Sequence, residues 1–255
     1  MAKFYFNGCS HTYGDELVDP KKSRWSRVVC DHFDAEEINV SEGGSSNDRI
    51  FRMLFEDTAQ YDYDHVFIMW THPERFEIFN ENNIEVMNPE DPRPYIPIKL
   101  NRILFSKPQP GGEISNSTRR ILENKSLRLA LEHYYDVLHN RKHQQVKFFT
   151  HIFQAQQFLE AKGIPYTMSF AFHQNFRTTV DNEFSNFKPH VTEELNKLIG
   201  LINWNRFIEQ GNTSYMLWAD HNGYDFGPIG HPLEEANFKW GQKTIKHLMD
   251  NHDAN

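Results

Sequence analysis

Phe4-Tyr5-Phe6-Asn7-Gly8-Cys9-Ser10-His11-Thr12-Tyr13-Gly14 is a short aromatic run that stops at a turn of small residues. Aromatic runs with period 2 that end in Gly are typical of strands, so we predict a first strand over 3–8. Ser10 would then stand just past the carboxyl end of that strand. In open α/β sheets this edge is where ligands bind, and a serine exposed on a sharp turn there can act as a nucleophile. A serine in this place is also a common helix N-cap or turn residue.

The rest of the chain alternates predicted strands with predicted helices. Strands are expected over 37–40, 65–70 and 165–172, with a short last strand over 215–219. Helical spacing of apolar residues predicts helices over 23–33, from Ser46 or Asn47 to about Glu56, and over 234–249. This alternation predicts an α/β fold, a three-layer sandwich with a mostly parallel, flavodoxin-like sheet.

The middle of the chain departs from this rhythm. Residues 80–112 hold six prolines and are expected to form an irregular excursion. Residues 115–162 are expected to form two helices that meet near Asn140. Their two apolar stripes are interpreted as core-facing, one of Leu127, Leu131, Tyr134, Tyr135 and Leu138, the other of Phe149, Ile152, Phe153, Gln156 and Leu159. We therefore predict one domain over 1–255, with an irregular and helical insertion at about 77–163.

Composition limits the classes of partner. The net charge of −8 disfavours a nucleic-acid partner, because a phosphate-binding surface needs excess positive charge. Two cysteines indicate a reduced compartment without disulfides. No apolar run approaches the ~20 residues of a membrane span, and the first predicted strand begins at once, so we expect no membrane partner and a cytoplasmic location. The chain is compact and rich in Asn and Phe, and in this it resembles phage proteins. A phage protein of this kind would be located in the cytoplasm of the host. The oligomeric state stays open.

A second candidate residue lies near the C-terminus. Gly230-His231-Pro232 precedes the last predicted helix. A hydroxyl is a poor nucleophile at neutral pH and needs a base, for which histidine is the usual choice. A loop just before the last helix can fold back over the first strand, so His231 is the candidate base. The chain holds 14 histidines, however, and any one of them is more often structural or solvated.

Taken together, four blocks resemble the SGNH hydrolase family, the GDSL-type esterases and lipases. Gly8-Cys9-Ser10-His11-Thr12 resembles the first block, with Cys9 where the family has Asp. Residues 42–50 are similar to the second block, residues 67–71 take the place of the third, and Gly230-His231-Pro232 resembles the fifth. The resemblance implies an ester hydrolase of esterase or deacetylase type that needs no cofactor and no metal.

The resemblance also implies residue roles. Ser10 would be the nucleophile and His231 the base, and the backbone N–H groups of Ser10 and Gly44 would form an oxyanion hole. The family's third-block Asn is replaced by Thr71 or His72, so Asn47 is the expected side-chain donor to the oxyanion. Pro228 stands where the family has its acid, and Asp225 is the nearest acid upstream. A Ser–His dyad oriented by a backbone carbonyl is the alternative to a triad with Asp225.

Four further residues are expected to line the cleft. His11 follows the nucleophile, and Thr71, His72 and Arg75 follow a central strand, so all four belong to the same sheet edge. Arg75 is suited to a substrate carboxylate or phosphate. Its alternative is an ion pair with Glu74, Glu77 or another local acid. The family favours short-chain esters and O-acetyl groups on carbohydrate as substrates.

Three other interpretations stay open. A metal-dependent hydrolase could use His11, His72, His231 and Asp225 as zinc ligands, although no tight ligand spacing is present. A fold of this class that has lost its third-block Asn and fifth-block Asp could also be a catalytically silent module that binds carbohydrate. A Cys9 nucleophile is the weakest option, because its side chain would point away from that of Ser10.

Overall fold

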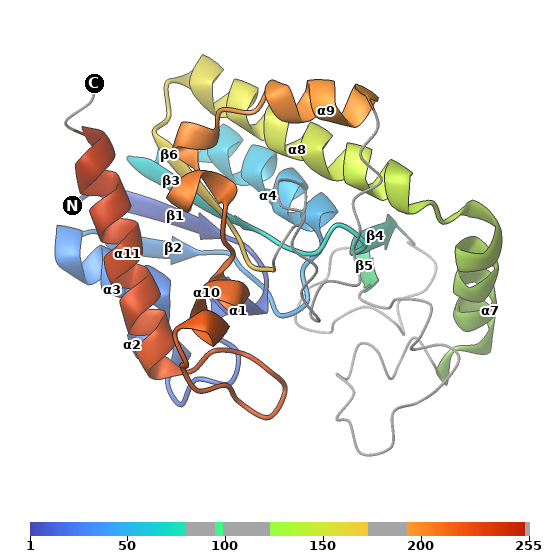
Figure 1. The fold of residues 1–255 in the computed structure, drawn as a ribbon, viewed down its shortest axis with the longest axis horizontal. Helices are drawn as coiled ribbons and strands as arrows, with labels where there is room; N and C mark the ends of the chain where they lie inside the picture. The colour runs from blue at the N-terminus through green and yellow to red at the C-terminus, as the bar shows by residue number, and fades with distance from the viewer. Residues whose placement is uncertain (80–94, 99–122, 173–192, 253–255) are drawn as a thin grey trace.

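A four-stranded parallel sheet forms the centre of the computed structural model, which describes residues 1–79, 95–98, 123–172 and 193–252 (Figure 1). The strands are ordered β2 (Glu36–Asn39), β1 (Lys3–Asn7), β3 (His65–Trp70) and β6 (Tyr166–Phe170). Phe6 is in register with Phe67, and the two rings stack with centroids 4.6 Å apart. The predicted mostly parallel, flavodoxin-like sheet is confirmed, and the four strands fall within two residues of their predicted bounds.

Helices cover both faces of this sheet, so the molecule has three layers. Figure 1 shows α3 (Trp25–Phe33) and α11 (Glu234–His252) on one face and α4 (Asn47–Gln60) and α8 (Arg141–Lys162) on the other. Each face has its own apolar core, one around Trp25 and Trp240, the other around Trp70 and Ile152. All six residues of β3 are buried, as expected for a central parallel strand. Burial of each large apolar side chain contributes about 1.5–3 kcal/mol.

Local capping residues set the helix boundaries. The Ser46 hydroxyl accepts the backbone N–H of Arg49 at 3.1 Å and starts α4. The Asn140 side chain accepts the N–H of His143 at 3.2 Å and starts α8, which confirms the predicted meeting point near Asn140. Side-chain acceptors at these positions satisfy N–H groups that the first turn leaves without partners.

The first helical stripe is only partly core-facing. A helix α7 (Lys125–His133) runs into a π-helical turn, η2 (Tyr134–Leu138). Leu127, Leu131 and Tyr135 are buried, but Leu138 is 69% exposed. A π turn holds more residues than an α turn, so the stripe loses its phase there. The second stripe, on α8, packs in the core through Phe149, Ile152 and Leu159. Beside α8 lies α9 (Glu193–Gly200).

Two other sequence predictions are wrong. The expected last strand over 215–219 is a helix, α10 (Tyr215–His221), because Ser214 caps it by accepting the N–H of Leu217 at 3.2 Å. The expected irregular excursion over 80–112 contains a strand, β5 (Tyr95–Ile98), which pairs antiparallel with β4 (Phe76–Phe79) just before the excursion. The remainder of that excursion, 80–94 and 99–112, lies outside the described residues, as do 115–122. Of the helices that the structure describes, none has the length and apolar content required to cross a membrane.

The connections place a topological switch point at the carboxyl ends of β1 and β3. From β1 the chain leads through short helices α1 (Ser10–Tyr13) and α2 (Pro20–Ser23) to α3 on one face. From β3 it leads to α8 on the opposite face (Figure 1). Adjacent parallel strands whose helices leave on opposite faces open a crevice between their carboxyl ends, which is where ligands bind in such sheets. Residues 8–12 and 71–75 follow these two strand ends.

Candidate active site

Ser10 is the first residue of α1 and is 5% exposed. The N–H groups of a first helical turn have no intrahelical acceptor, so the backbone N–H of Ser10 is suited to bind an oxygen of a ligand. The turn is held from β2, because Asn39 Nδ2 donates to the backbone carbonyl of Thr12 at 3.0 Å. Cys9 is fully buried in the apolar core, which argues against it as a nucleophile.

His231 is held by a carboxylate from the other end of the chain. Its ring Nδ1 lies 2.7 Å from Glu16 Oε2, and its backbone N–H donates to the same oxygen at 2.8 Å. Since an ionised carboxylate only accepts, Nδ1 carries the proton of the neutral ring, and Nε2 is left as the acceptor. This is the tautomer that a general base requires.

Glu16 also binds the loop that carries the histidine. Its Oε1 accepts the N–H of Ile229 at 2.7 Å. Burial raises the pKa of Glu16, but the hydrogen bonds from Ile229 and His231 outweigh it and hold that pKa below its ordinary value. The residue has φ of +70°, a left-handed conformation that costs free energy outside glycine and is typical of functional sites.

Asp225 was predicted to hold the histidine, and this prediction is corrected by the contacts. The acid at Nδ1 is Glu16. In the part of the chain that the structure describes, Asp225 makes its hydrogen bond through its backbone carbonyl, which accepts the N–H of Leu233 at 3.0 Å. Phe226 and Pro232 form a β-bridge, and no described hydrogen bond joins the Asp225 carboxylate to the His231 ring.

His11 lies directly against His231, with ring centroids 4.9 Å apart. Its ring is 4% exposed and also contacts Phe172, at 5.0 Å. Burial, and then the charges of His231 and Arg75, lower the pKa of His11 well below its ordinary value. His11 is therefore neutral beside the candidate base. Through His11, the residue that follows Ser10, the two ends of the chain meet at this edge of the sheet.

The second-block loop is a rigid turn. The N–H of Ser45 donates to the carbonyl of Glu42 at 3.1 Å, and Gly44 within the turn has φ of +77°, a conformation that favours glycine. Arg49 clamps the loop, since its Nη1 donates to the carbonyl of Val40 at 3.0 Å and its Nε lies 3.1 Å from Glu42 Oε2. No described residue accepts a hydrogen bond from the backbone N–H of Gly44.

Asn47 was predicted to donate to the oxyanion, and its contacts correct this prediction. Asn47 Nδ2 donates to the carbonyls of Thr71 and His72 at 3.2 and 3.1 Å. Its Oδ1 accepts the N–H of Thr71 at 2.9 Å. Both N–H bonds of the amide are thus used by backbone oxygens, and Asn47 fastens the end of β3 to α4.

The third-block segment places the other predicted cleft residues together. Thr71 is fully buried, and its Oγ1 accepts from Arg75 Nη1 at 2.9 Å. The N–H of Glu74 donates to His72 Nδ1 at 3.3 Å, which leaves the proton of a neutral His72 ring on Nε2. His72 and Arg75 both lie on Phe172, at 6.3 and 4.9 Å from its ring centroid. His11, His72 and Arg75 therefore share one aromatic neighbour.

Two arrangements that the sequence interpretations called for are not seen among the described residues, namely a metal-binding cluster and a direct Ser10–His231 hydrogen bond. Among the described residues, no three or more His, Cys, Asp or Glu side chains are grouped so as to hold a metal ion, and this includes the proposed zinc ligands. No described hydrogen bond joins Ser10 to His231; such bonds are often long before substrate binds.

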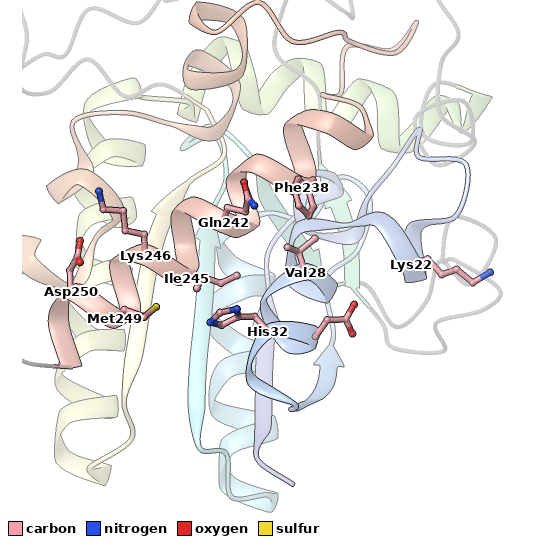
Figure 2. Close-up of a pocket in the computed structure, with 10 residues that line it drawn as sticks. Lys22, Val28, His32, Phe238, Gln242, Ile245, Lys246, Met249 and Asp250 are labelled. Carbon is pink, nitrogen blue, oxygen red and sulfur yellow. The ribbon is translucent and has the colours of Figure 1, made fainter.

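The cavity drawn in Figure 2 lies elsewhere, between α3 and α11. Its lining includes the apolar residues Val28, Phe238 and Ile245 and the charged residues Lys22, Lys246 and Asp250. None of the candidate site residues lines it. A nucleophile with an oriented base is more specific evidence for chemistry than concavity, so we take the edge near Ser10 as the site.

Sequence reasoning missed Glu16 and Arg49. Glu16 lies only six residues after the nucleophile, and nothing in its local pattern separates it from a surface acid. Arg49 lies within the second block, on the first turn of the helix that follows the glycine loop. An arginine in this place can be expected to bind the loop and hold it.

No protein-family model matches the chain, and no curated protein matches it in sequence. Solved structures that resemble it include a lipolytic protein of the G-D-S-L family from Desulfitobacterium hafniense, at 10% identity and TM-score 0.48, covering 97% of this chain and 99% of that one. A member of the same family from Veillonella parvula has 13% identity and TM-score 0.46, with 96% and 97% covered. The esterase EstA from Pseudoalteromonas sp., inhibited by monoethylphosphonate, has 11% identity and TM-score 0.47, with 99% and 100% covered.

Proposed function

We propose that the protein is a serine ester hydrolase with a Ser10–His231–Glu16 triad. The observation that carries the proposal is the contact of Glu16 Oε2 with His231 Nδ1 at 2.7 Å, beside the turn that holds Ser10. An oriented neutral imidazole next to a serine at a sheet edge is the arrangement that activates a hydroxyl. Glu16 is a positioning residue, because it acts through the ring of His231.

In this mechanism Ser10 Oγ attacks the acyl carbonyl carbon while its proton passes to His231 Nε2. The imidazolium is stabilised by Glu16 and then protonates the leaving alcohol. The backbone N–H groups of Ser10 and Gly44 donate to the developing oxyanion, and each donor of this kind is worth about 3–4 kcal/mol in the transition state. In the second half of the reaction, His231 takes a proton from water while that water attacks the carbonyl carbon of the acyl-enzyme. His231 then returns the proton to Ser10 Oγ, and the carboxylic acid is released.

The substrates proposed are short-chain acyl esters, which include O-acetyl groups on carbohydrate. Phe172 and the half-buried His72 lie against each other and offer a small surface of mixed polarity, which suits a short acyl group. His72 is the third oxyanion donor in this proposal, because a neutral His72 ring that accepts the N–H of Glu74 at Nδ1 carries its proton on Nε2.

Labelling by a fluorophosphonate tests the proposal, because that reagent bonds covalently only to an activated serine. We expect one equivalent bound by the native protein, none by Ser10→Ala, and turnover of 4-nitrophenyl acetate that Ser10→Ala abolishes. Thermal melts of both proteins show whether the variant is folded. Hydrolysis that survives Ser10→Ala but is lost on chelation would indicate the metal-dependent alternative. Absence of labelling, with binding of acetylated sugars, would indicate the silent binding module.

A further inference from the structure

Arg75 carries a positive charge that no acid of the described residues neutralises. Its Nη1 donates to the Thr71 hydroxyl at 2.9 Å, and its Cζ lies 4.9 Å from the centroid of the Phe172 ring. Its backbone N–H donates to the carbonyl of His72 at 3.1 Å, so backbone and side chain are both fixed. The guanidinium has five N–H donors, of which one is used by Thr71.

The carboxylates near Arg75 in sequence and in space are engaged elsewhere. Glu77 pairs with Arg52, whose Nη2 lies 3.2 Å from each of its oxygens. Asp48 pairs with Lys147 at 2.7 Å. Burial, and then the charge of Glu74, raise the pKa of Tyr135, so this carboxylate also acts on a group other than Arg75. Among the described residues, the ion pair of Arg75 with Glu74, Glu77 or another local acid, which was the alternative expected from sequence, is not found.

The same guanidinium lies close to the proposed catalytic residues. Phe172 contacts both Arg75 and His11, and His11 contacts His231. After burial, the charges of His231 and Arg75 are the causes that lower the pKa of His11. A half-buried guanidinium that no described acid neutralises costs desolvation free energy, and a planar carboxylate is the ligand that its fork fits best.

We propose that Arg75 binds an anionic group of the substrate, so that the preferred esters carry a carboxylate on the acyl part, a few bonds from the scissile carbonyl. This inference rests on the proposed function. Thr71 and Phe172 hold the guanidinium in place before the ester arrives, which reduces the entropy lost when the charged pair forms. A phosphate has the same charge sign and is distinguished from a carboxylate in the experiment.

The test compares 4-nitrophenyl hemisuccinate with its methyl ester, in which the carboxylate is masked. The rate with Ser10→Ala protein is subtracted, because the free carboxylate of a hemisuccinate attacks its own ester. We expect the native protein to favour the anionic ester by tenfold or more in kcat/KM. Arg75→Gln should reduce that ratio to near one, and Arg75→Lys should retain part of it. Arg27→Gln, which removes one positive charge from the surface of α3, should leave the ratio unchanged.

Free succinate and inorganic phosphate are then compared as competitive inhibitors of the neutral ester. Inhibition by succinate that weakens at least tenfold in Arg75→Gln supports a carboxylate site, whereas equal or stronger inhibition by phosphate overturns the choice of carboxylate. The inference is overturned if both esters are turned over at equal rates and Arg75→Gln does not change the ratio of their kcat/KM values. That result would not affect the proposal that the protein is a serine ester hydrolase. Failure of Ser10-dependent turnover on either ester counts against the proposed function itself.

Discussion

Glu16 and His231, 215 positions apart in sequence, share one carboxylate oxygen that accepts both the backbone N–H and the ring Nδ1–H of the histidine. The second oxygen accepts the N–H of Ile229, and Val18, two residues on, donates its N–H to Glu234 at 2.9 Å. These bonds join the segment after α1 to the loop before α11. The same contacts that orient the imidazole therefore close the two ends of the chain over the sheet edge.

Glu16→Gln should lower kcat/KM by about 10²–10⁴-fold, because the amide neither fixes the tautomer nor stabilises the imidazolium. Asp225→Asn, the matched change at the acid expected from sequence, should stay within about twofold of the native protein. Steady-state kinetics on 4-nitrophenyl acetate measure both. A purely structural role for Glu16 would instead reduce the fraction of sites that a fluorophosphonate titrates and leave the turnover per titrated site unchanged.

His72→Ala should reduce kcat about tenfold or more with little change in KM, since a donor to the oxyanion acts mainly in the transition state. His72→Asn, which restores the residue type typical of the resembling family, should keep most of the activity. Equal losses in the two variants would remove His72 from the oxyanion hole.

Asn47→Ala should destabilise the fold by about 2–3 kcal/mol, because the N–H of Thr71 and two backbone carbonyls lose their partner in a buried place. For a chain of this size that corresponds to a fall in Tm of roughly 5–10 °C. Differential scanning calorimetry checks it. A Tm unchanged by the substitution, together with a loss of kcat, would restore Asn47 as a donor to substrate.

The parallel sheet was predictable from sequence because its strands are apolar runs bounded by glycine and polar turns, and burial on both faces leaves little ambiguity. Ser10 and His231 are predicted as nucleophile and base because both follow local sequence signals, and these roles stay predictions. Asp225 is the acid expected from sequence because it is the nearest one upstream of His231. The contact between Glu16 and His231 depends on how the two ends of the chain pack together. Local sequence patterns carry no information on that packing.

Similar reasoning explains the errors at Tyr215 and Asn47. The short apolar run at 215–219 is compatible with a strand or a helix. The Ser214 side chain caps it and thereby favours the helix α10. The asparagine stands in a family-like block, but its role depends on whether its amide faces a ligand or backbone carbonyls. Side-chain hydrogen bonds of this kind are set by tertiary packing rather than by propensity.

Stability should fall on acidification between pH 6.5 and about 4 because of His151. Its ring stacks on Phe51 with centroids 4.5 Å apart, and burial lowers its pKa to about 4, with Asp48 opposing and Lys147 adding to the shift. Below about pH 6.5 the His151 ring is protonated in the unfolded chain but not in the folded one. Its contribution to the free energy of unfolding is therefore fully present above that pH and decreases below it. The slope from this one group is at most about 1.4 kcal/mol per pH unit.

His151→Phe should flatten that dependence, because the ring stack is kept and the titration is removed. Urea unfolding at a series of pH values between 4 and 7 measures the slope. His221→Gln, at an exposed position on α10, is the control and should follow the native protein. His11, whose pKa is also lowered by burial, acts in the same direction, so part of the slope should persist in His151→Phe. Identical slopes for the native protein and His151→Phe would show that the ring is already protonated, or solvated, in the folded state.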